Sequence, residues 1–301
     1  MSLLYALAEI RTPILDMIQT AISFFGGETF LVIVIALCYW CYDKRLAYRI
    51  SFAYIIAGTL GQLLKVIFHI PRPWVKDPDF KPVERGLSEA TGYSFPSMHS
   101  VDIGCLSFSY LFKGKHLWLK IIAVILVIAV PFSRMYLGYH TLQDVLLGLA
   151  IAFLITFLVN KFMDSTATDK TQYLKFTFIL LIFPLVLLCV SLALYYNEVI
   201  DYANMLDAVK SSGGFTAIIL SWYFESTYIN FNERCDRWWK QLLKAIIGVG
   251  IIIGLRFALK SLFGMFGENF WFGDFLRYFL MIGISMGVYP IAIKKFFSAK
   301  Y

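Results

Sequence analysis

Long apolar stretches alternate with short polar loops along almost the whole chain. Several stretches approach the roughly 20 apolar residues that a helix needs to cross the hydrocarbon core of a membrane. The pattern predicts an all-α protein, a polytopic transmembrane helical bundle. The expected spans are residues 24–42, 46–70, 97–113, 117–134, 140–162, 172–195, 213–230, 242–263 and 270–296.

Residues 1–22 have a different pattern, in which apolar residues at near-helical spacing alternate with charged ones. No small-residue cleavage site follows, so we expect no signal peptide. The pattern favours an amphipathic interfacial helix that lies on the membrane. We therefore expect three parts, an interfacial helix (1–22), a core bundle (23–163) and a C-terminal four-span extension (164–301).

Basic residues gather in alternate loops. Loops 43–45, 113–116 and 161–175 are rich in Lys and Arg, whereas the loop 198–207 is acidic. Because positive loops stay on the cytoplasmic side, this alternation sets the expected topology. It also accounts for the net charge of +7, so we expect the lipid bilayer as partner and no nucleic acid.

Three polar islands interrupt the apolar pattern at the ends of expected spans. The rise of about 1.5 Å per residue in a helix places all three at the outer interface, so we expect them to converge. The islands are Lys65-x6-Arg72-Pro73, Pro96-Ser97-Met98-His99 and Ser133-Arg134-x5-His140-x3-Asp144.

The cations of these islands suit a phosphoryl group. Lys65 and Arg72 are seven residues apart, which would place them on one face of a helix. Arg134 adds a second guanidinium, and Arg forks match phosphate oxygens. Ser97 and Met98 open an expected helix, whose N-terminus favours anions. The alternative is that the cations only reach lipid headgroups and that Ser97 is only a helix cap.

The two histidines of the islands favour divided roles as nucleophile and general acid. Asp144 follows His140 by one helical turn and is placed to orient its imidazole. His99 is the second histidine, and we expect His69 to lie outside the chemistry. Because cations crowd the site, we expect no metal and no cofactor.

The three-part pattern resembles the type 2 phosphatidic acid phosphatase / vanadium haloperoxidase superfamily, whose signature reads KxxxxxxRP, PSGH and SRxxxxxHxxxD. The likeness covers about residues 24–163, and Met98 replaces the usual Gly. It implies a helical bundle without a metal requirement. It also implies residue roles: His140 as nucleophile forming a phosphohistidine, Asp144 as its orienter, His99 as acid, and Lys65, Arg72, Ser97 and Arg134 as phosphate ligands, with a backbone N–H at Met98.

The extension carries charged residues at expected membrane depth, Glu225, Arg256 and Arg277. They either form structural pairs, such as Arg277 with Asp274, or extend the headgroup pocket, and we favour pairing. Residues 211–214, Ser-Ser-Gly-Gly, are typical of a loop.

We expect a metal-independent integral membrane phosphatase in the bacterial cell membrane, with its site facing outside. The expected substrate is a lipid mono- or diphosphate: undecaprenyl diphosphate, phosphatidylglycerol phosphate, phosphatidate or a sphingoid phosphate. Two alternatives stay open. One is a lipid phosphotransferase on the same scaffold, and the other is a non-enzymatic lipid transporter or flippase.

Overall fold

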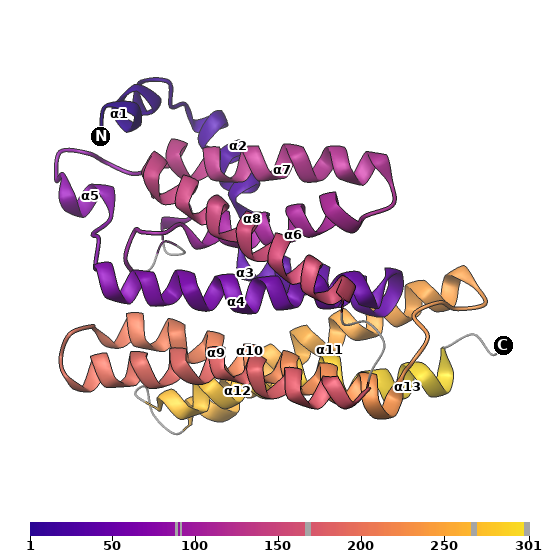
Figure 1. The fold of residues 1–301 in the computed structure, drawn as a ribbon. Helices are drawn as coiled ribbons and strands as arrows, with labels where there is room; N and C mark the ends of the chain where they lie inside the picture. The colour runs from indigo at the N-terminus through magenta and orange to yellow at the C-terminus, as the bar shows by residue number, and fades with distance from the viewer. Residues whose placement is uncertain (88–89, 91, 166–169, 266–269, 298–301) are drawn as a thin grey trace. The chain divides into compact units, whose positions relative to one another are not determined.

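A computed structural model of the protein describes residues 1–87, 90, 92–165, 170–265 and 270–297. All regular elements in these ranges are helical, which confirms the all-α class (Figure 1). Three π-helical segments within the described ranges continue α3, α10 and α12. Such segments, with their wider turns, often occur at functional sites.

The elements follow one another along the chain as follows. They are α1 (Ser2–Glu9), α2 (Pro13–Phe24), α3 (Glu28–Leu37), η1 (Cys38–Tyr42), α4 (Lys44–Phe68), α5 (Pro73–Lys76), α6 (Met98–Lys113), α7 (Leu117–Tyr136), α8 (Leu142–Ser165), α9 (Lys170–Tyr196), α10 (Tyr202–Phe224), η3 (Glu225–Ile229), α11 (Trp238–Gly264), α12 (Trp271–Gly283), η4 (Ile284–Val288) and α13 (Tyr289–Phe296).

The chain folds into two compact units. The first unit is Met1–Val32 with Phe52–Lys161, and the second is Ile33–Ser51 with Phe162–Tyr301. All three polar islands belong to the first unit. The second unit takes most of the C-terminal extension together with a short stretch from the N-terminal third of the chain.

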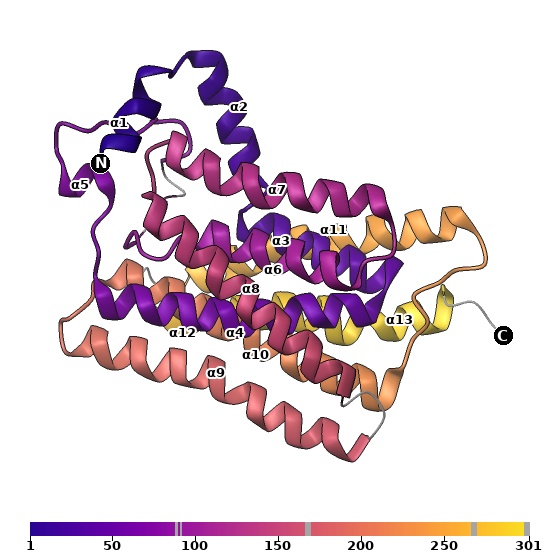
Figure 2. The same ribbon diagram turned by 45° about the horizontal axis from the view of Figure 1, so that its top comes forward.

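Small residues bring the helices of the first unit close together. α7 packs against α6 and against α2, as the two views of Figures 1 and 2 show. On α8, a side chain at Gly148 would reach within 2.7 Å of the Ser97 carbonyl oxygen. Only a glycine permits this approach of α8 to the start of α6, because any Cβ would overlap the backbone.

The expected single helix over residues 1–22 is two helices. α1 ends at Glu9, and α2 begins at Pro13 with Thr12 as its N-cap, whose side chain accepts a hydrogen bond from the Leu15 N–H at 3.3 Å. Pro13 disfavours the helical conformation of the residue before it, which explains the break. Ile10 and Ile14 are exposed.

The expected count of nine spans is not confirmed. By length and composition, six helical stretches in the described ranges are able to cross a membrane, and a seventh is possible if α2 and the α3–η1 helix, bent by 48°, form one span. α6 has only 16 residues, about 24 Å, against a hydrocarbon core of about 30 Å. α10 is a continuous helix long enough to cross, but small and polar residues interrupt its apolar sequence.

In the second unit, α10 packs against α9 and α12. Residues 211–214 lie inside α10 and form no loop, contrary to the prediction. Gly213 contacts the backbone of Phe275 on α12 so closely that a Cβ would overlap it. The small residues therefore serve helix packing, which a local loop signal does not reveal.

The charged residues of the extension do not all find the expected partners. Arg277 pairs with Asp274 at 2.6 Å, as predicted. Glu225 is buried and pairs with Lys44 at 3.1 Å, while Arg256 is exposed on α11. Lys44 lies in the loop that the sequence assigns to the cytoplasmic side, so its pairing with Glu225 joins two segments 181 residues apart.

Candidate active site

Lys65 and Arg72 reach the site from two different elements. α4 ends at Phe68, and His69 adopts a left-handed conformation with φ of 49°. Arg72 is the extended N-cap of α5, so the expectation that both cations share one helix face is wrong. Pro71 disfavours a helical conformation at Ile70, which keeps the chain extended up to Arg72.

Both cations are buried and held by backbone carbonyls. Lys65 and Arg72 are each 6% exposed. Lys65 Nζ donates to the Tyr93 carbonyl, and Arg72 Nε donates to the Gly92 carbonyl at 2.9 Å. His69 packs edge-on against the Tyr93 ring, with 5.0 Å between the ring centroids. The loop at residues 92–94 therefore lines the cation side of the site.

Ser97 caps α6, as the alternative reading of the sequence proposed. Its side chain accepts a hydrogen bond from the Ser100 N–H at 3.4 Å, and its own N–H donates to the Asp144 carbonyl at 3.0 Å. The next residue, Met98, directs its thioether towards α4, where a Cβ at Gly61 would lie 2.8 Å from the sulfur. The side chain of Met98 is thus accommodated by the glycine opposite.

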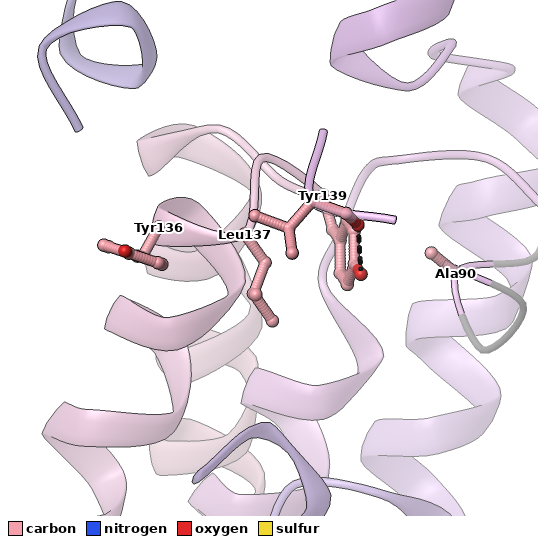
Figure 3. Close-up of a cluster of buried hydrophobic side chains, with 5 residues drawn as sticks. Ala90, Tyr136, Leu137 and Tyr139 are labelled. Atoms are coloured by element: carbon pink, nitrogen blue, oxygen red, sulfur yellow. Dashed lines mark hydrogen bonds between the residues drawn. The ribbon is translucent and has the colours of Figure 1, made fainter. Parts of the chain in front are cut away.

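Arg134 lies at the end of α7 and is 1% exposed. Its Nη1 donates to the Ser23 hydroxyl at 2.7 Å, and its guanidinium lies 4.6 Å from the centroid of the Tyr139 ring. Cation–π contacts of this kind orient a guanidinium. Tyr139 itself belongs to a buried cluster at the turn after α7 (Figure 3).

His140 lies in the turn before α8, between a guanidinium and a carboxylate. Arg72 Nη1 is 2.8 Å from His140 Nε2, and Asp144 Oδ2 is 3.6 Å from His140 Nδ1. A guanidinium only donates hydrogen bonds, so Nε2 must accept and the ring proton resides on Nδ1. This is the tautomer that a nucleophilic Nε2 requires.

Asp144 is itself fixed by two donors. Its Oδ2 accepts hydrogen bonds from the Ser94 hydroxyl at 2.6 Å and from the Thr141 N–H at 2.7 Å. These bonds hold the carboxylate beside His140, although the 3.6 Å separation exceeds a hydrogen bond. A small shift of either side chain would close that gap.

The protonation of His140 follows from its surroundings. Burial, and then the positive charges of Arg72, Arg134 and Lys65, lower the pKa of His140 well below its ordinary value. The imidazole is therefore neutral at pH 7 and keeps its lone pair. A buried histidine next to three cations is costly to protonate until an anion arrives.

His99 lies in the first turn of α6, and its electrostatic interactions join it to Arg134, His140 and Arg72. Its Nε2 is buried and has no hydrogen-bond partner among the described residues. An unpaired buried ring nitrogen is costly. It is available for a proton transfer to or from a group bound between the two histidines.

The first unit thus brings the three cations, the two histidines and Asp144 together, whereas the Ser133 hydroxyl donates to the Val130 carbonyl of its own helix. The sequence did not indicate Ser23, Ser94 or Tyr139. Ser23 accepts a hydrogen bond from Arg134, Ser94 donates one to Asp144, and the Tyr139 ring packs against the Arg134 guanidinium. No spacing rule indicates Ser23, which lies 111 residues from its partner. Among the described residues, no cluster of three His, Cys, Asp or Glu side chains is arranged as metal ligands.

Two family models match this chain. Residues 46–168 match the family model described as PAP2 superfamily, and residues 209–300 match a second model, PAP2 superfamily phosphatase, transmembrane extension. Phosphatidylglycerophosphatase B of Bacillus subtilis is 30% identical over 166 residues, which are 51% of this chain and 77% of that protein.

Other relatives are phosphatases of different lipids. Undecaprenyl-diphosphatase BcrC of Bacillus subtilis is 28% identical over 158 residues, 51% of this chain and 78% of that protein. Sphingosine-1-phosphate phosphatase 2 of Homo sapiens is 28% identical over 187 residues, 59% of this chain but only 43% of that protein.

One similar solved structure is a transmembrane PAP2 type phosphatidylglycerolphosphate phosphatase from Bacillus subtilis, with 28% sequence identity and a TM-score of 0.46. The alignment covers 55% of this chain and 84% of the chain of that structure. The identity to phosphatidylglycerophosphatase B extends over more than two thirds of that relative. The chain is an integral membrane protein that belongs to the PAP2 superfamily.

Proposed function

We propose that the protein is a lipid phosphatase that hydrolyses a lipid mono- or diphosphate through a phosphohistidine on His140, without a metal ion. The observation that carries this proposal is the pair of contacts on one imidazole. Arg72 lies at Nε2 and Asp144 lies behind Nδ1, which is the arrangement of an activated nitrogen nucleophile.

In the first step the phosphoryl group enters between His140 and His99. Its oxygens take over the donors of Arg72, Lys65 and Arg134, together with the N–H groups at the start of α6. Arg72 then moves from Nε2 to a phosphoryl oxygen and leaves the Nε2 lone pair free. Binding of the substrate thus uncovers the nucleophile.

Nε2 then forms a bond to phosphorus as the bond to the leaving oxygen breaks. The leaving alcohol or phosphate takes a proton from His99, and Asp144 stabilises the positive charge of the His140 ring through Nδ1–H. In the second step His99 accepts a proton from water, whose oxygen attacks phosphorus. The P–N bond breaks, inorganic phosphate leaves, and both histidines return to their starting states.

The substrate class follows from burial and from the relatives. The relatives are named as phosphatases of phosphatidylglycerol phosphate, undecaprenyl diphosphate and sphingosine 1-phosphate. A site within an apolar bundle favours a substrate whose tail stays in the bilayer, because extracting it costs about 0.8 kcal/mol per CH₂. Among these lipids we place undecaprenyl diphosphate first, for a bacterial cell membrane with the site facing outside.

The expected interfacial location of the N-terminal helices fits their exposed side chains. Ile10, Ile14 and Met17 expose 54%, 68% and 51% of their surface. Exposure of this size is costly in water and favourable at a membrane surface. This exposure supports the prediction that the N-terminal segment 1–22 lies on the membrane, now as the two helices α1 and α2.

The test is a phosphate-release panel with the full chain in detergent and EDTA. The substrates are undecaprenyl diphosphate, phosphatidylglycerol phosphate, phosphatidate and a sphingoid phosphate, and the His140→Ala variant is the control. We expect release from at least one lipid by the wild type and none by the variant. Release of no phosphate would contradict the proposal, and a phosphorylated acceptor alcohol would identify a phosphotransferase instead.

A further inference from the structure

Tyr139 contacts two of the phosphate-binding cations and directly precedes the nucleophile. Its ring lies 4.6 Å from the Arg134 guanidinium, and its carbonyl accepts a hydrogen bond from Arg72 Nη1 at 3.1 Å. Its N–H donates to the Arg134 carbonyl at 3.0 Å. The residue is 1% exposed, so its ring has little freedom to move away from Arg134.

The other end of Tyr139 contacts residues 77–87, which we call the outer segment. The Tyr139 hydroxyl lies 2.8 Å from the Val83 carbonyl, the dashed line in Figure 3. It also lies 2.7 Å from the Arg85 carbonyl. One hydroxyl proton is shared between these two acceptors. Gly86, with φ of 83°, brings the backbone so near that a Cβ there would lie 3.6 Å from the hydroxyl.

The outer segment is anchored at further points that do not involve the Tyr139 hydroxyl. The Val83 N–H donates to the Leu137 carbonyl at 2.9 Å, and Phe80 is 2% exposed. Phe80 packs against Gly138, where a side chain would reach within 2.8 Å of the ring. The segment therefore keeps its general place without the hydroxyl, and the hydroxyl fixes the ring within it.

These contacts form one connected path. The outer segment accepts the hydrogen bonds of the Tyr139 hydroxyl, and the Tyr139 ring makes the cation–π contact with Arg134. The Tyr139 carbonyl accepts the hydrogen bond from Arg72. A tyrosine side chain has only two rotatable bonds, so fixing its tip fixes its ring. Small errors in the position of a charge-stabilising group are costly, since a misplacement of about 1 Å can reduce a rate about 100-fold.

We propose that Tyr139 is a positioning residue that couples the outer segment to the phosphate-binding cations Arg134 and Arg72. The residue does not touch the reacting atoms. Its role is to set the orientation of the two guanidiniums, and the outer segment thereby contributes to transition-state binding. This inference rests on the proposed phosphatase function.

The chain offers a matched control in Tyr136. This residue is also 1% exposed, and its hydroxyl donates a hydrogen bond to Asp16 Oδ1 at 3.0 Å. It belongs to the same buried cluster (Figure 3). Its hydroxyl partner is on α2 and not on the outer segment, so Tyr136→Phe removes a comparable bond that does not lie on the proposed path.

The experiment compares Tyr139→Phe, Tyr139→Leu and Tyr136→Phe in the full chain. The readouts are kcat and KM for phosphate release, inhibition by orthovanadate, melting temperature, and hydrogen exchange of residues 83–87. We expect Tyr139→Phe to lower kcat and to weaken vanadate inhibition about fivefold, the equivalent of one lost hydrogen bond. Tyr139→Leu, which also removes the ring, should cost about 100-fold.

We expect Tyr136→Phe to lower the melting temperature as much as Tyr139→Phe, with kcat and vanadate inhibition unchanged. Equal kinetics for the two phenylalanine variants would overturn the inference and leave Tyr139 with a structural role. A wild type that releases no phosphate would refute the proposed function instead. In that case, faster exchange of residues 83–87 in Tyr139→Phe than in Tyr136→Phe would still support the anchor, and equal exchange would refute it.

Discussion

The two histidines of the site differ in what surrounds them. His140 has the Arg72 guanidinium at Nε2 and the Asp144 carboxylate 3.6 Å from Nδ1, near enough to orient the ring although too far for a hydrogen bond. The Nε2 of His99 has no hydrogen-bond partner among the described residues. A nucleophile needs a fixed tautomer and an orienting partner, whereas an acid needs a free nitrogen facing the leaving group. This difference supports the proposal that His140 attacks phosphorus and that His99 transfers the proton.

The roles of the histidines can be separated by the leaving group. We expect His140→Ala to lose at least about 10⁴-fold in kcat on every substrate, because the variant lacks the proposed nucleophile. His99→Ala should slow the first step, release of the leaving group, by about 10²- to 10⁴-fold on a lipid substrate but much less on an aryl phosphate, whose leaving group needs no proton. The measurement is the single-turnover rate of leaving-group release from both substrates, because the second step is common to them and would hide the difference in kcat. Equal losses by His99→Ala on the two substrates would refute its role as acid.

Met98 and Gly61 form a second pair at the residue scale. Because a Cβ at Gly61 would lie 2.8 Å from the Met98 sulfur, Gly61→Ala should destabilise the protein through overpacking, by about 1–3 kcal/mol. Adding Met98→Ala should recover part of this loss, and a double-mutant cycle measures the coupling.

The control for that pair is Gly250→Ala on α11, where an added Cβ meets nothing within 4 Å. This variant should be neutral or slightly stabilising, since Ala favours the helix by about 1 kcal/mol. It should show no coupling to Met98→Ala. The readout is thermal unfolding in detergent. If the effects of Gly61→Ala and Met98→Ala on the free energy of unfolding were additive, the Met98 side chain would not contact position 61.

At the scale of elements, the three π-helical segments all belong to the second unit and gather its polar contacts. In η1, the Tyr39 hydroxyl donates to the Met286 carbonyl of η4 at 3.0 Å, and Trp40 Nε1 donates to the Ser285 carbonyl at 3.2 Å. In η3, Glu225 accepts hydrogen bonds from Lys44 and from the Tyr48 hydroxyl. These contacts join η1 to η4 and α4 to η3 within the second unit.

Removing Glu225 tests whether this buried pair stabilises the second unit. Glu225 is 1% exposed, and its loss would leave the Lys44 ammonium, 17% exposed, without its carboxylate. We expect Glu225→Ala to cost about 3–5 kcal/mol in the free energy of unfolding, because one partner of a buried pair is removed. The measurement is unfolding in detergent.

The matched control is Asp207→Asn, which removes the more exposed pair with Lys210 at 3.5 Å. Exposed pairs contribute about 0–1 kcal/mol, so this variant should melt close to the wild type. If Glu225→Ala had the same melting temperature as Asp207→Asn, the buried pair would contribute nothing to the stability of the unit.

The sequence predicts the helices and the members of the site better than it predicts their contacts. Apolar length and the spacing of the islands suffice to nominate Lys65, Arg72, Arg134 and the two histidines, because the chemistry of phosphate limits the residue types. The end of α4 at Phe68 was missed, since it depends on the left-handed turn at His69. The bond from Arg134 to Ser23 was also missed, because only the folded chain brings these residues together.

At the scale of the whole molecule, the division into units does not follow the chain order. Residues 33–51 belong to the second unit, although they precede the polar islands. Tyr39 and Trp40 are fully buried there, against partners near residue 285. The C-terminal extension thus packs against residues 33–51 of the N-terminal third of the chain and forms one unit with them.

A truncated chain tests this dependence. We expect residues 1–161 alone to aggregate or to be degraded, because Tyr39 and Trp40 would lose the partners that cover them. Coexpression of residues 162–301 as a separate chain should restore a soluble, active complex in detergent. Size-exclusion chromatography and phosphate release are the readouts. A monodisperse and fully active 1–161 chain would contradict the assignment of residues 33–51 to the second unit.

The central claim, a covalent phosphohistidine on His140, has a direct test in the His99→Ala variant. With an aryl phosphate this variant should still form the phosphoenzyme, but it lacks the base that activates water, so the intermediate should accumulate. Mass spectrometry of rapidly quenched protein is predicted to find an acid-labile, alkali-stable phosphoryl group on the peptide that contains His140, and to find none in the His99→Ala/His140→Ala double variant. A phosphoryl group on another residue, or turnover with no trapped phosphoenzyme, would contradict the account.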